Sequence, residues 1–417
     1  MTESVGVSRR SARELTSPVG LALAGGAPGG AIYEIGALRA LDEAIVGLDL
    51  RDCGCFVGVS AGAFLTSCLA NGLSTAQQVR AIVKQEPGEH PFVPETFFQP
   101  AVGELSRRLL QVPRLLGGAL ADFVSRRERR LVDALTVLGQ AVPTGVFDNE
   151  PIREYVKKIF SIKGRTDDFS QLESKLTVVA TDIESGESAR FGHLGMPYVP
   201  ISRAVQASTA LPGLYPPVEI NGRWYVDGVL LKTMHASVAL EAGAQLVLCI
   251  NPLVPVDTRQ GVQRNELPPG QITRKGLPSV LSQTVRTLIH SRMVLGVEAY
   301  ETKYPDADVI LIEPSRDDYE DFFSNIFSFA SRRAVCERAF EATRNQLRRR
   351  RKQIEPILAK WDLALDHEFL DDPHRDLWAG VGLHDMAPDG ATPTVAGPEV
   401  LDELEGLLDR VEHALES

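Results

Sequence analysis

The chain has 417 residues and a formal net charge of −11 at pH 7, with 44% hydrophobic and 24% charged residues. This composition predicts a globular protein with room for one large domain plus extensions, or for two domains. The acidic balance argues against a nucleic-acid partner, because phosphate binding needs a basic face.

The N-terminal residues 1–18 are polar and carry Arg9, Arg10 and Arg13, without an apolar run of signal-peptide length. No stretch elsewhere approaches the roughly 20 apolar residues that span a bilayer. We therefore expect a cytoplasmic protein whose membrane contact is peripheral. The five cysteines form an odd set without metal-ligand spacing, which predicts buried free thiols: Cys53, Cys55, Cys68, Cys249 and Cys336.

Short apolar runs mark the expected strands. Residues 19–23 and 55–59 each precede a glycine-containing turn and a helical pattern, and two such units in succession predict a parallel α/β sheet. The apolar runs at 176–181, 246–250 and 309–312 suit strands that are buried on both faces. The sheet is thus expected to draw on distant parts of the chain.

A glycine-rich turn, Gly25-Gly26-Ala27-Pro28-Gly29-Gly30, follows the first expected strand and precedes a helical pattern. Glycines let backbone N–H groups converge on one point, and a helix N-terminus favours negative charge. Gly25 and Gly30 have the separation of a phosphate-binding P-loop, but Ala31-Ile32 replace the required Lys-Ser/Thr. The turn therefore predicts donors for an oxyanion rather than a nucleotide site.

The second turn contains Gly58-Val59-Ser60-Ala61-Gly62, between the strand 55–59 and a helical pattern that ends at Asn71-Gly72. Gly58 and Gly62 allow a sharp strand-to-helix turn that presents the Ser60 hydroxyl at a helix N-terminus. A serine in this position can attack an acyl carbon. The five-residue motif alone also occurs in ordinary turns, so its context carries the assignment.

Residues 98–142 interrupt the alternation of expected strands and helices. They contain apolar residues interspersed with arginines. Between Gly103 and Arg130, seven Arg against three acidic residues give a local net charge of +4. The favoured interpretation is a helical insertion that covers the core with a solvated basic face. The alternative is an interfacial lid through which residues 103–130 meet anionic lipid.

Residues 217–226 alternate apolar and polar side chains around Asn221-Gly222, a strong hairpin signal. Asp227-Gly228 stands at the hairpin exit, where the Asp227 carboxylate can reach a neighbouring turn and serve Ser60 as a base. Asp-Gly also occurs in ordinary turns. Four histidines lack a local signature, so a Ser-His-Asp triad stays open: His193, His235, His290 and His384.

The C-terminal part begins with a long helical pattern after Ile326 that ends in the basic run 348–352. Residues 366–398 are rich in Asp, Pro and Gly, which indicates loose order. Residues 399–417 place five apolar residues on one stripe. This stripe predicts docking on the domain or pairing with another chain in a homo-oligomer.

Three blocks, taken together, resemble the patatin-like phospholipases: residues 23–30, residues 58–62, and residues 207–213 leading to Val226-Asp227-Gly228. The intervening residues 180–186 are also typical of that family. The resemblance extends over about residues 19–315. It implies a three-layer α/β fold with a largely parallel central sheet flanked by helices.

The resemblance also implies a catalytic dyad, with Ser60 as nucleophile and Asp227 as general base. It places the oxyanion hole at Gly25, Gly26 and Ala27, with Gly29 and Gly30 as further members, and implies hydrolysis of lipid acyl esters without a metal or cofactor. Two departures from the family pattern are visible: in the glycine turn Ala27 replaces a third glycine and Gly29 a basic residue, and residues 229–235 replace the Gly and Asn-Pro common after Asp-Gly. Pro28 has no N–H to donate, whereas Gly26, Ala27 and Gly29 do.

Two alternatives accompany this hypothesis: a Ser-His-Asp esterase that acts on small soluble esters, and a weakly active lipid-binding scaffold. We divide the chain into a flexible tail (1–18), a catalytic domain (19–352) that contains the insertion, and a C-terminal extension (353–417) with a loosely ordered linker and a terminal amphipathic helix.

Overall fold

The computed structural model describes residues 15–84, 99–101, 143–231, 234–317 and 331–381. Nearly all of the expected insertion and the whole C-terminal stripe lie outside these residues.

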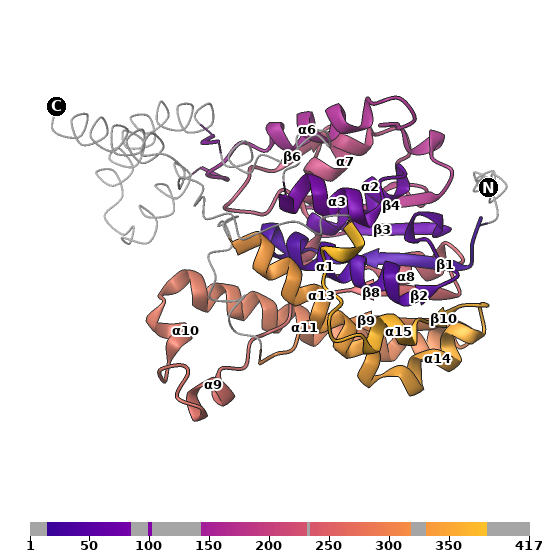
Figure 1. The fold of residues 1–417 in the computed structure, drawn as a ribbon. Helices are drawn as coiled ribbons and strands as arrows, with labels where there is room; N and C mark the ends of the chain where they lie inside the picture. Colours follow the sequence, from indigo (N-terminus) through magenta and orange to yellow (C-terminus); the bar gives the residue numbers. More distant parts are fainter. Residues whose placement is uncertain (1–14, 85–98, 102–142, 232–233, 318–330, 382–417) are drawn as a thin grey trace, which may run out of the picture.

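The described chain forms an eight-stranded mixed sheet (Figure 1). Its five central strands are parallel: β4 (Lys175–Asp182), β3 (Cys55–Val59), β1 (Val19–Leu23), β8 (Leu246–Ile250) and β9 (Asp308–Ile312), in that spatial order. Three antiparallel strands extend the β4 side: β5 (Ser188–Gly192), β7 (Arg223–Asp227) and β6 (Val218–Ile220). The predicted largely parallel sheet is confirmed.

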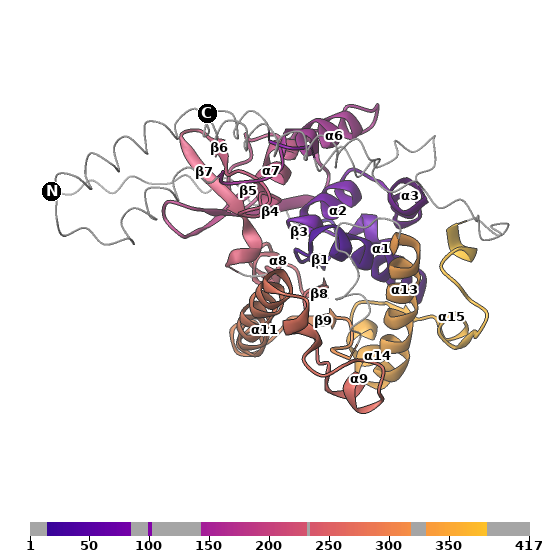
Figure 2. The ribbon, with the colours of Figure 1, turned by 90° about the vertical axis from the view of Figure 1, so that its left-hand side faces the viewer.

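Helices cover both faces of the sheet, and β1 shows why. Leu21 and Leu23 face a core shared with α1 and α2, whereas Ala22 faces a second core shared with α8 and α11. Figure 2 shows the sheet between these two helical layers. The main helices are α1 (Ala27–Ala44), α2 (Ala61–Ala70), α6 (Glu150–Phe160), α7 (Ile201–Ser208), α8 (Ala236–Glu241), α11 (Leu277–Lys303) and α13 (Arg332–Arg349).

Short helical segments connect these elements: η1 (Leu50–Asp52), α3 (Thr75–Gln78), the π-helical η2 (Val79–Lys84), η5 (Phe169–Gln171), η6 (Gly228–Leu230), α9 (Arg259–Gln263), α10 (Gln271–Arg274) and η8 (Ala379–Val381).

The segment that follows α13 packs on the same core as the sheet. Its elements are α14 (Arg351–Ala359), β10 (Ala364–Leu365), which pairs with β2 (Ile45–Val46), and α15 (His367–Asp371). Phe369, Leu370 and Trp378 are buried in the α1 side of the core. Residues 354–381, which the sequence analysis assigned to an extension, therefore contribute to the interior.

The parallel strands bring two functional turns to one edge of the sheet. Leu23 at the end of β1 is paired with Gly58 of β3 and with Ile250 of β8. The turns after β1 and β3 therefore leave from the same carboxyl edge, where ligands bind in open α/β sheets.

The β6–β7 hairpin supplies the third functional segment. Asn221 and Gly222 have φ angles of 53° and 76°, the left-handed conformations that a tight hairpin turn requires. The predicted hairpin is confirmed. Its second strand runs antiparallel to β4 and places Asp227 opposite Ala180.

All five cysteines are buried and free, as predicted. Among the helices that the structure describes, none combines the length and apolar character needed to cross a membrane.

Candidate active site

Ser60 lies in a tight turn between β3 and α2. Its φ of 52° and ψ of −121° form a backbone conformation that non-glycine residues rarely adopt. Only glycine fits on either side: a Cβ on Gly62 would lie 2.5 Å from the carbonyl oxygen of Ala24, and one on Gly58 would collide with Ala63. This close packing fixes the N-terminus of α2 against the end of β1.

The Ser60 backbone is held by Ser208, at the C-terminal end of α7. The Ser60 N–H donates to Ser208 Oγ at 2.8 Å, and that hydroxyl donates to the Val179 carbonyl oxygen at 2.6 Å. Ser208 thus connects the serine turn to β4. Ser208 lies inside the block 207–213, but nothing in the sequence indicates this contact.

Asp227, the last residue of β7, meets Ser60 directly. The Ser60 side chain lies close enough to the buried Asp227 carboxylate to lower its pKa, and the carboxylate accepts the Val229 N–H at 2.9 Å. The Asp227 N–H donates to the Ala210 carbonyl oxygen at 3.0 Å, and Thr181 Oγ1 donates to the Asp227 carbonyl oxygen at 3.1 Å. The carboxylate therefore has a fixed position beside the serine.

Burial changes the acidity of this carboxylate. It raises the pKa of Asp227 from an ordinary value to about 7, while the hydrogen bonds from Ser60 and Val229 act in the opposite direction. An aspartate with an ordinary pKa near ~3.9 is a poor base at neutral pH. With a pKa of about 7, Asp227 can take up a proton and release it again under these conditions.

The glycine turn after β1 approaches the same point. A Cβ on Gly25 would lie 3.0 Å from Ser60 Cβ, so the two residues are in contact. Gly26 lies against Pro252 and precedes α1, whose first turn contains Ala27 and Gly29. The Gly30 N–H already donates to the Gly26 carbonyl oxygen at 2.8 Å. The expectation that Gly30 belongs to the oxyanion hole is therefore wrong, because its N–H is already used within α1.

The first residue of α2 offers a further donor. Ala61 immediately follows Ser60, and within the described part of the chain its N–H meets no acceptor, because the first N–H groups of a helix have no intrahelical partner. No side-chain pattern in the sequence points to this backbone group. Both backbone segments, the glycine turn and the α2 N-terminus, therefore lie next to Ser60, Gly25 by contact and Ala61 by its place in the chain.

Glu34, on the buried side of α1, is an ionisable group that does not belong to the candidate active site. Its side chain is fully buried, neither carboxyl oxygen has a hydrogen-bond partner among the described residues, and burial raises its pKa well above the ordinary value. The folded state therefore retains a proton that the unfolded state loses as the pH rises above about 4.3.

We expect Glu34→Gln to raise the thermal midpoint at about pH 8, with a difference that shrinks toward about pH 5, because the amide removes the cost of ionisation. Thermal unfolding followed by circular dichroism checks this, with the exposed Glu187→Gln as the control. A destabilised Glu34→Gln at the higher pH would show that the carboxylate has a favourable partner.

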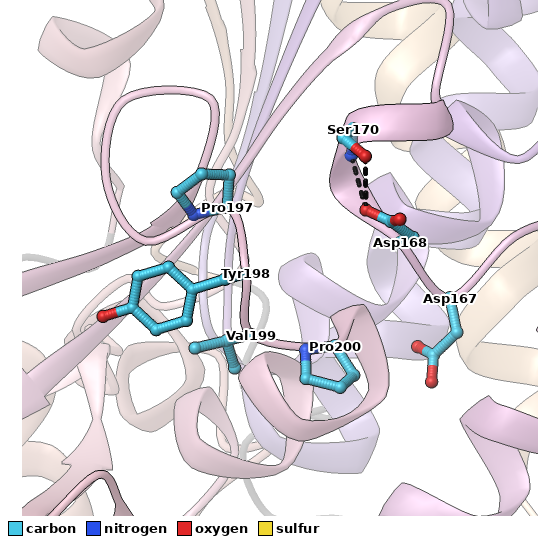
Figure 3. Close-up of a pocket in the computed structure, with 7 residues that line it drawn as sticks. All are labelled: Asp167, Asp168, Ser170, Pro197, Tyr198, Val199 and Pro200. Carbon is cyan, nitrogen blue, oxygen red and sulfur yellow. Dashed lines mark hydrogen bonds between the residues drawn. The ribbon is translucent and has the colours of Figure 1, made fainter.

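A surface cavity of about 450 Å³ lies away from Ser60 and Asp227. The acidic side chains that line it form hydrogen bonds with neighbouring backbone and hydroxyl groups. Figure 3 shows its acidic wall, where Asp168 accepts hydrogen bonds from Ser170. Asp167 accepts from the Ser202 N–H at 2.6 Å and so caps α7. Neither Ser60 nor Asp227 lines this cavity.

A model of the patatin-like phospholipase family matches residues 21–240, which include the glycine turn, Ser60 and Asp227. The chain belongs to the patatin-like phospholipase family. This assignment confirms the resemblance inferred from the three sequence blocks and makes the protein a relative of lipid hydrolases.

Curated relatives match this patatin-like chain over a short stretch. Uncharacterized NTE family proteins of Mycobacterium tuberculosis and Mycobacterium bovis are 32% identical over 81 residues. The matched stretch spans 19% of this chain and about a fifth (21%) of the length of those proteins.

Two solved structures are similar at low sequence identity. VipD from Legionella pneumophila is 16% identical, with a TM-score of 0.36, and the match covers 79% of this chain and 66% of that one. ExoU from Pseudomonas aeruginosa, in complex with SpcU, is 14% identical, with a TM-score of 0.27 and coverage of 66% and 52%.

Proposed function

We propose that this protein is a serine lipid acyl hydrolase that cleaves carboxylic esters of lipids through an acyl-enzyme. The observation that carries the proposal is the approach of the Ser60 side chain to a buried Asp227 carboxylate whose pKa is about 7. Membership of the patatin-like phospholipase family supports the substrate class.

In the proposed first half-reaction, Ser60 Oγ attacks the carbonyl carbon of the ester while its proton moves to Asp227. The carbonyl oxygen becomes an oxyanion, which is stabilised by the N–H groups of Gly25, Gly26, Ala27 and Ala61, with Gly29 as a further candidate donor. Collapse of this intermediate breaks the ester bond. The leaving alcohol takes the proton from Asp227, and the acyl group stays on Ser60.

In the second half-reaction, water attacks the acyl-enzyme and gives its proton to Asp227. The tetrahedral intermediate releases the fatty acid as Ser60 Oγ recovers a proton. Asp227 thus acts as base and then as acid in each half-reaction. A group with this double role works best when its pKa is close to the operating pH.

The direct Ser60–Asp227 contact supports a dyad over a Ser-His-Asp triad. In a triad, an imidazole stands between the serine and the carboxylate. Here the Ser60 side chain itself acts on the pKa of the Asp227 carboxylate, which also accepts a hydrogen bond from the Val229 N–H.

Lipid profiling tests the proposal and its substrate class together. Purified protein and its Ser60→Ala variant are incubated with mixed phospholipids, and the products are separated by mass spectrometry. We expect free fatty acid and lysophospholipid from the wild type alone. Equal product from both proteins would refute the role of Ser60, and hydrolysis of small esters without any lipid product would refute the substrate class.

The pH profile tests the role of Asp227. Only the ionised carboxylate can accept the serine proton, so kcat/KM for a soluble ester should fall about tenfold per pH unit below about 7 and level off above it. Steady-state kinetics with p-nitrophenyl butyrate provides the measurement. An unchanged rate down to about pH 5 would contradict the base assignment, because Asp227 would then be protonated.

A further inference from the structure

The long helix α11 exposes an apolar face to solvent. Its opposite side, with Ile289 and Tyr300, packs on the core beneath β8. The exposed residues recur at helical spacing and lie on one stripe: Leu277 (69% exposed), Leu281 (53%), Val285 (42%), Leu288 (62%) and Leu295 (66%). Four leucines in such a stripe are unusual for a face that stays in water, and they indicate an interaction surface.

The charge around this stripe is positive. Residues 271–297 contain four Lys or Arg and no Asp or Glu, a net charge of +4 in a chain of −11. Arg274, Lys275 and Arg292 are exposed, whereas the Arg286 guanidinium donates to the Val254 carbonyl oxygen at 3.1 Å. The surface thus combines apolar side chains with cations that reach solvent.

The N-terminal half of α11 extends past the edge of the sheet at which Ser60 lies. Asn251, the residue after β8, donates to Met293 Sδ at 3.2 Å, which places Met293 level with the carboxyl edge. The 16 residues before Met293 continue for about 24 Å at ~1.5 Å per residue. Figure 1 shows α11 and α10 projecting beyond the strands.

We propose that the apolar face of α11 docks the enzyme on an anionic lipid surface. The leucines would enter the boundary between head groups and acyl chains, while Arg274, Lys275 and Arg292 contact anionic head groups. This orientation turns the carboxyl edge of the sheet toward the lipid. That the bound lipid is also the substrate rests on the proposed function, whereas the docking surface follows from the exposed side chains of α11 alone.

Charge favours lipid over a second copy of this chain. Two copies that meet through this face would bring two sets of exposed cations together, Arg274, Lys275 and Arg292 from each copy, which opposes pairing. An anionic membrane presents the complementary charge and accepts the exposed leucines without a matching protein groove.

Vesicle co-sedimentation of the full chain tests the proposal, with phosphatidylcholine vesicles that contain or lack phosphatidylserine. We expect tighter binding to the anionic vesicles and a loss of at least about tenfold in affinity for Leu281→Glu/Leu288→Glu. Arg274→Glu/Arg292→Glu should lose the preference for anionic vesicles. The matched control is Val46→Glu, an apolar position 54% exposed on β2, which should bind as the wild type does.

Unchanged vesicle binding by Leu281→Glu/Leu288→Glu would overturn the proposal. A wild-type dimer in multi-angle light scattering that this variant dissociates would also overturn it, since a second copy would then cover the face. Binding is measured in the Ser60→Ala background as well, so that it does not depend on turnover. The leucine variant should keep wild-type activity on soluble p-nitrophenyl butyrate, which separates a docking defect from failure of the proposed chemistry.

Discussion

Ser60→Ala is expected to abolish ester hydrolysis, and Asp227→Asn to lower kcat on the order of 10³-fold or more. The first change removes the proposed nucleophile. The second keeps the size of the side chain but removes the carboxylate that is proposed to accept the serine proton. Steady-state kinetics on a soluble ester and on phospholipid vesicles measures both losses.

Matched control substitutions distinguish a loss of catalysis from a loss of the folded structure. Ser67→Ala removes a buried hydroxyl of α2 that donates to the Ala63 carbonyl oxygen, and Asp182→Asn alters a buried carboxylate at the end of β4. Both should retain activity within about threefold, because neither group touches Ser60. Asp227→Asn should stay folded, since it removes a buried carboxylate whose ionisation opposes folding. Substantial activity in pure Ser60→Ala or Asp227→Asn would refute the dyad.

Gly62→Ala is expected to damage both the fold and the activity. A Cβ at this position would lie 2.5 Å from the Ala24 carbonyl oxygen and 2.7 Å from Leu23 backbone and side-chain atoms, so α2 must move away from β1. Such overpacking costs about 1–3 kcal/mol or more. Calorimetry should show a thermal midpoint lower by several degrees, at about 2–4 °C per kcal/mol.

Gly29→Ala is the matched control for this substitution. Nothing lies within 4 Å of the position that its Cβ would occupy, and α1 accommodates alanine there. Its thermal midpoint and kcat should equal those of the wild type. A Gly62→Ala protein as stable and active as Gly29→Ala would show that the serine turn tolerates movement that the proposed geometry forbids.

The strands could be predicted because buried strands consist of short runs of apolar residues, which are visible in the sequence. Residues 19–23, 55–59 and 246–250 match β1, β3 and β8. β5 was missed, because Ser188–Gly192 has no long apolar run and owes its strand conformation to pairing with β4. Likewise, residues 366–381 have the composition of a loose linker, and only their contacts with α1 and α13 bury Leu370 and Trp378.

The sequence predicts the individual residues of the candidate site, but not how they come together in space. The two motifs single out Ser60 and Asp227 locally, but their contact depends on β4, which lies between β3 and β7. Ser208 and the Ala61 N–H gain their positions only when α7 and α2 pack on that sheet. The exposure of Leu281 and Leu288 is equally invisible in the sequence, because an apolar stripe usually indicates a buried helix face.

The most direct test of the central claim is to trap the acyl-enzyme. The wild type and Ser60→Ala are mixed with phospholipid vesicles, quenched in acid within one turnover, digested and analysed by mass spectrometry. The account predicts one acyl group on the wild-type peptide that contains Ser60, and none in the variant. An acyl group on another residue, or lysophospholipid formed by Ser60→Ala, would contradict it.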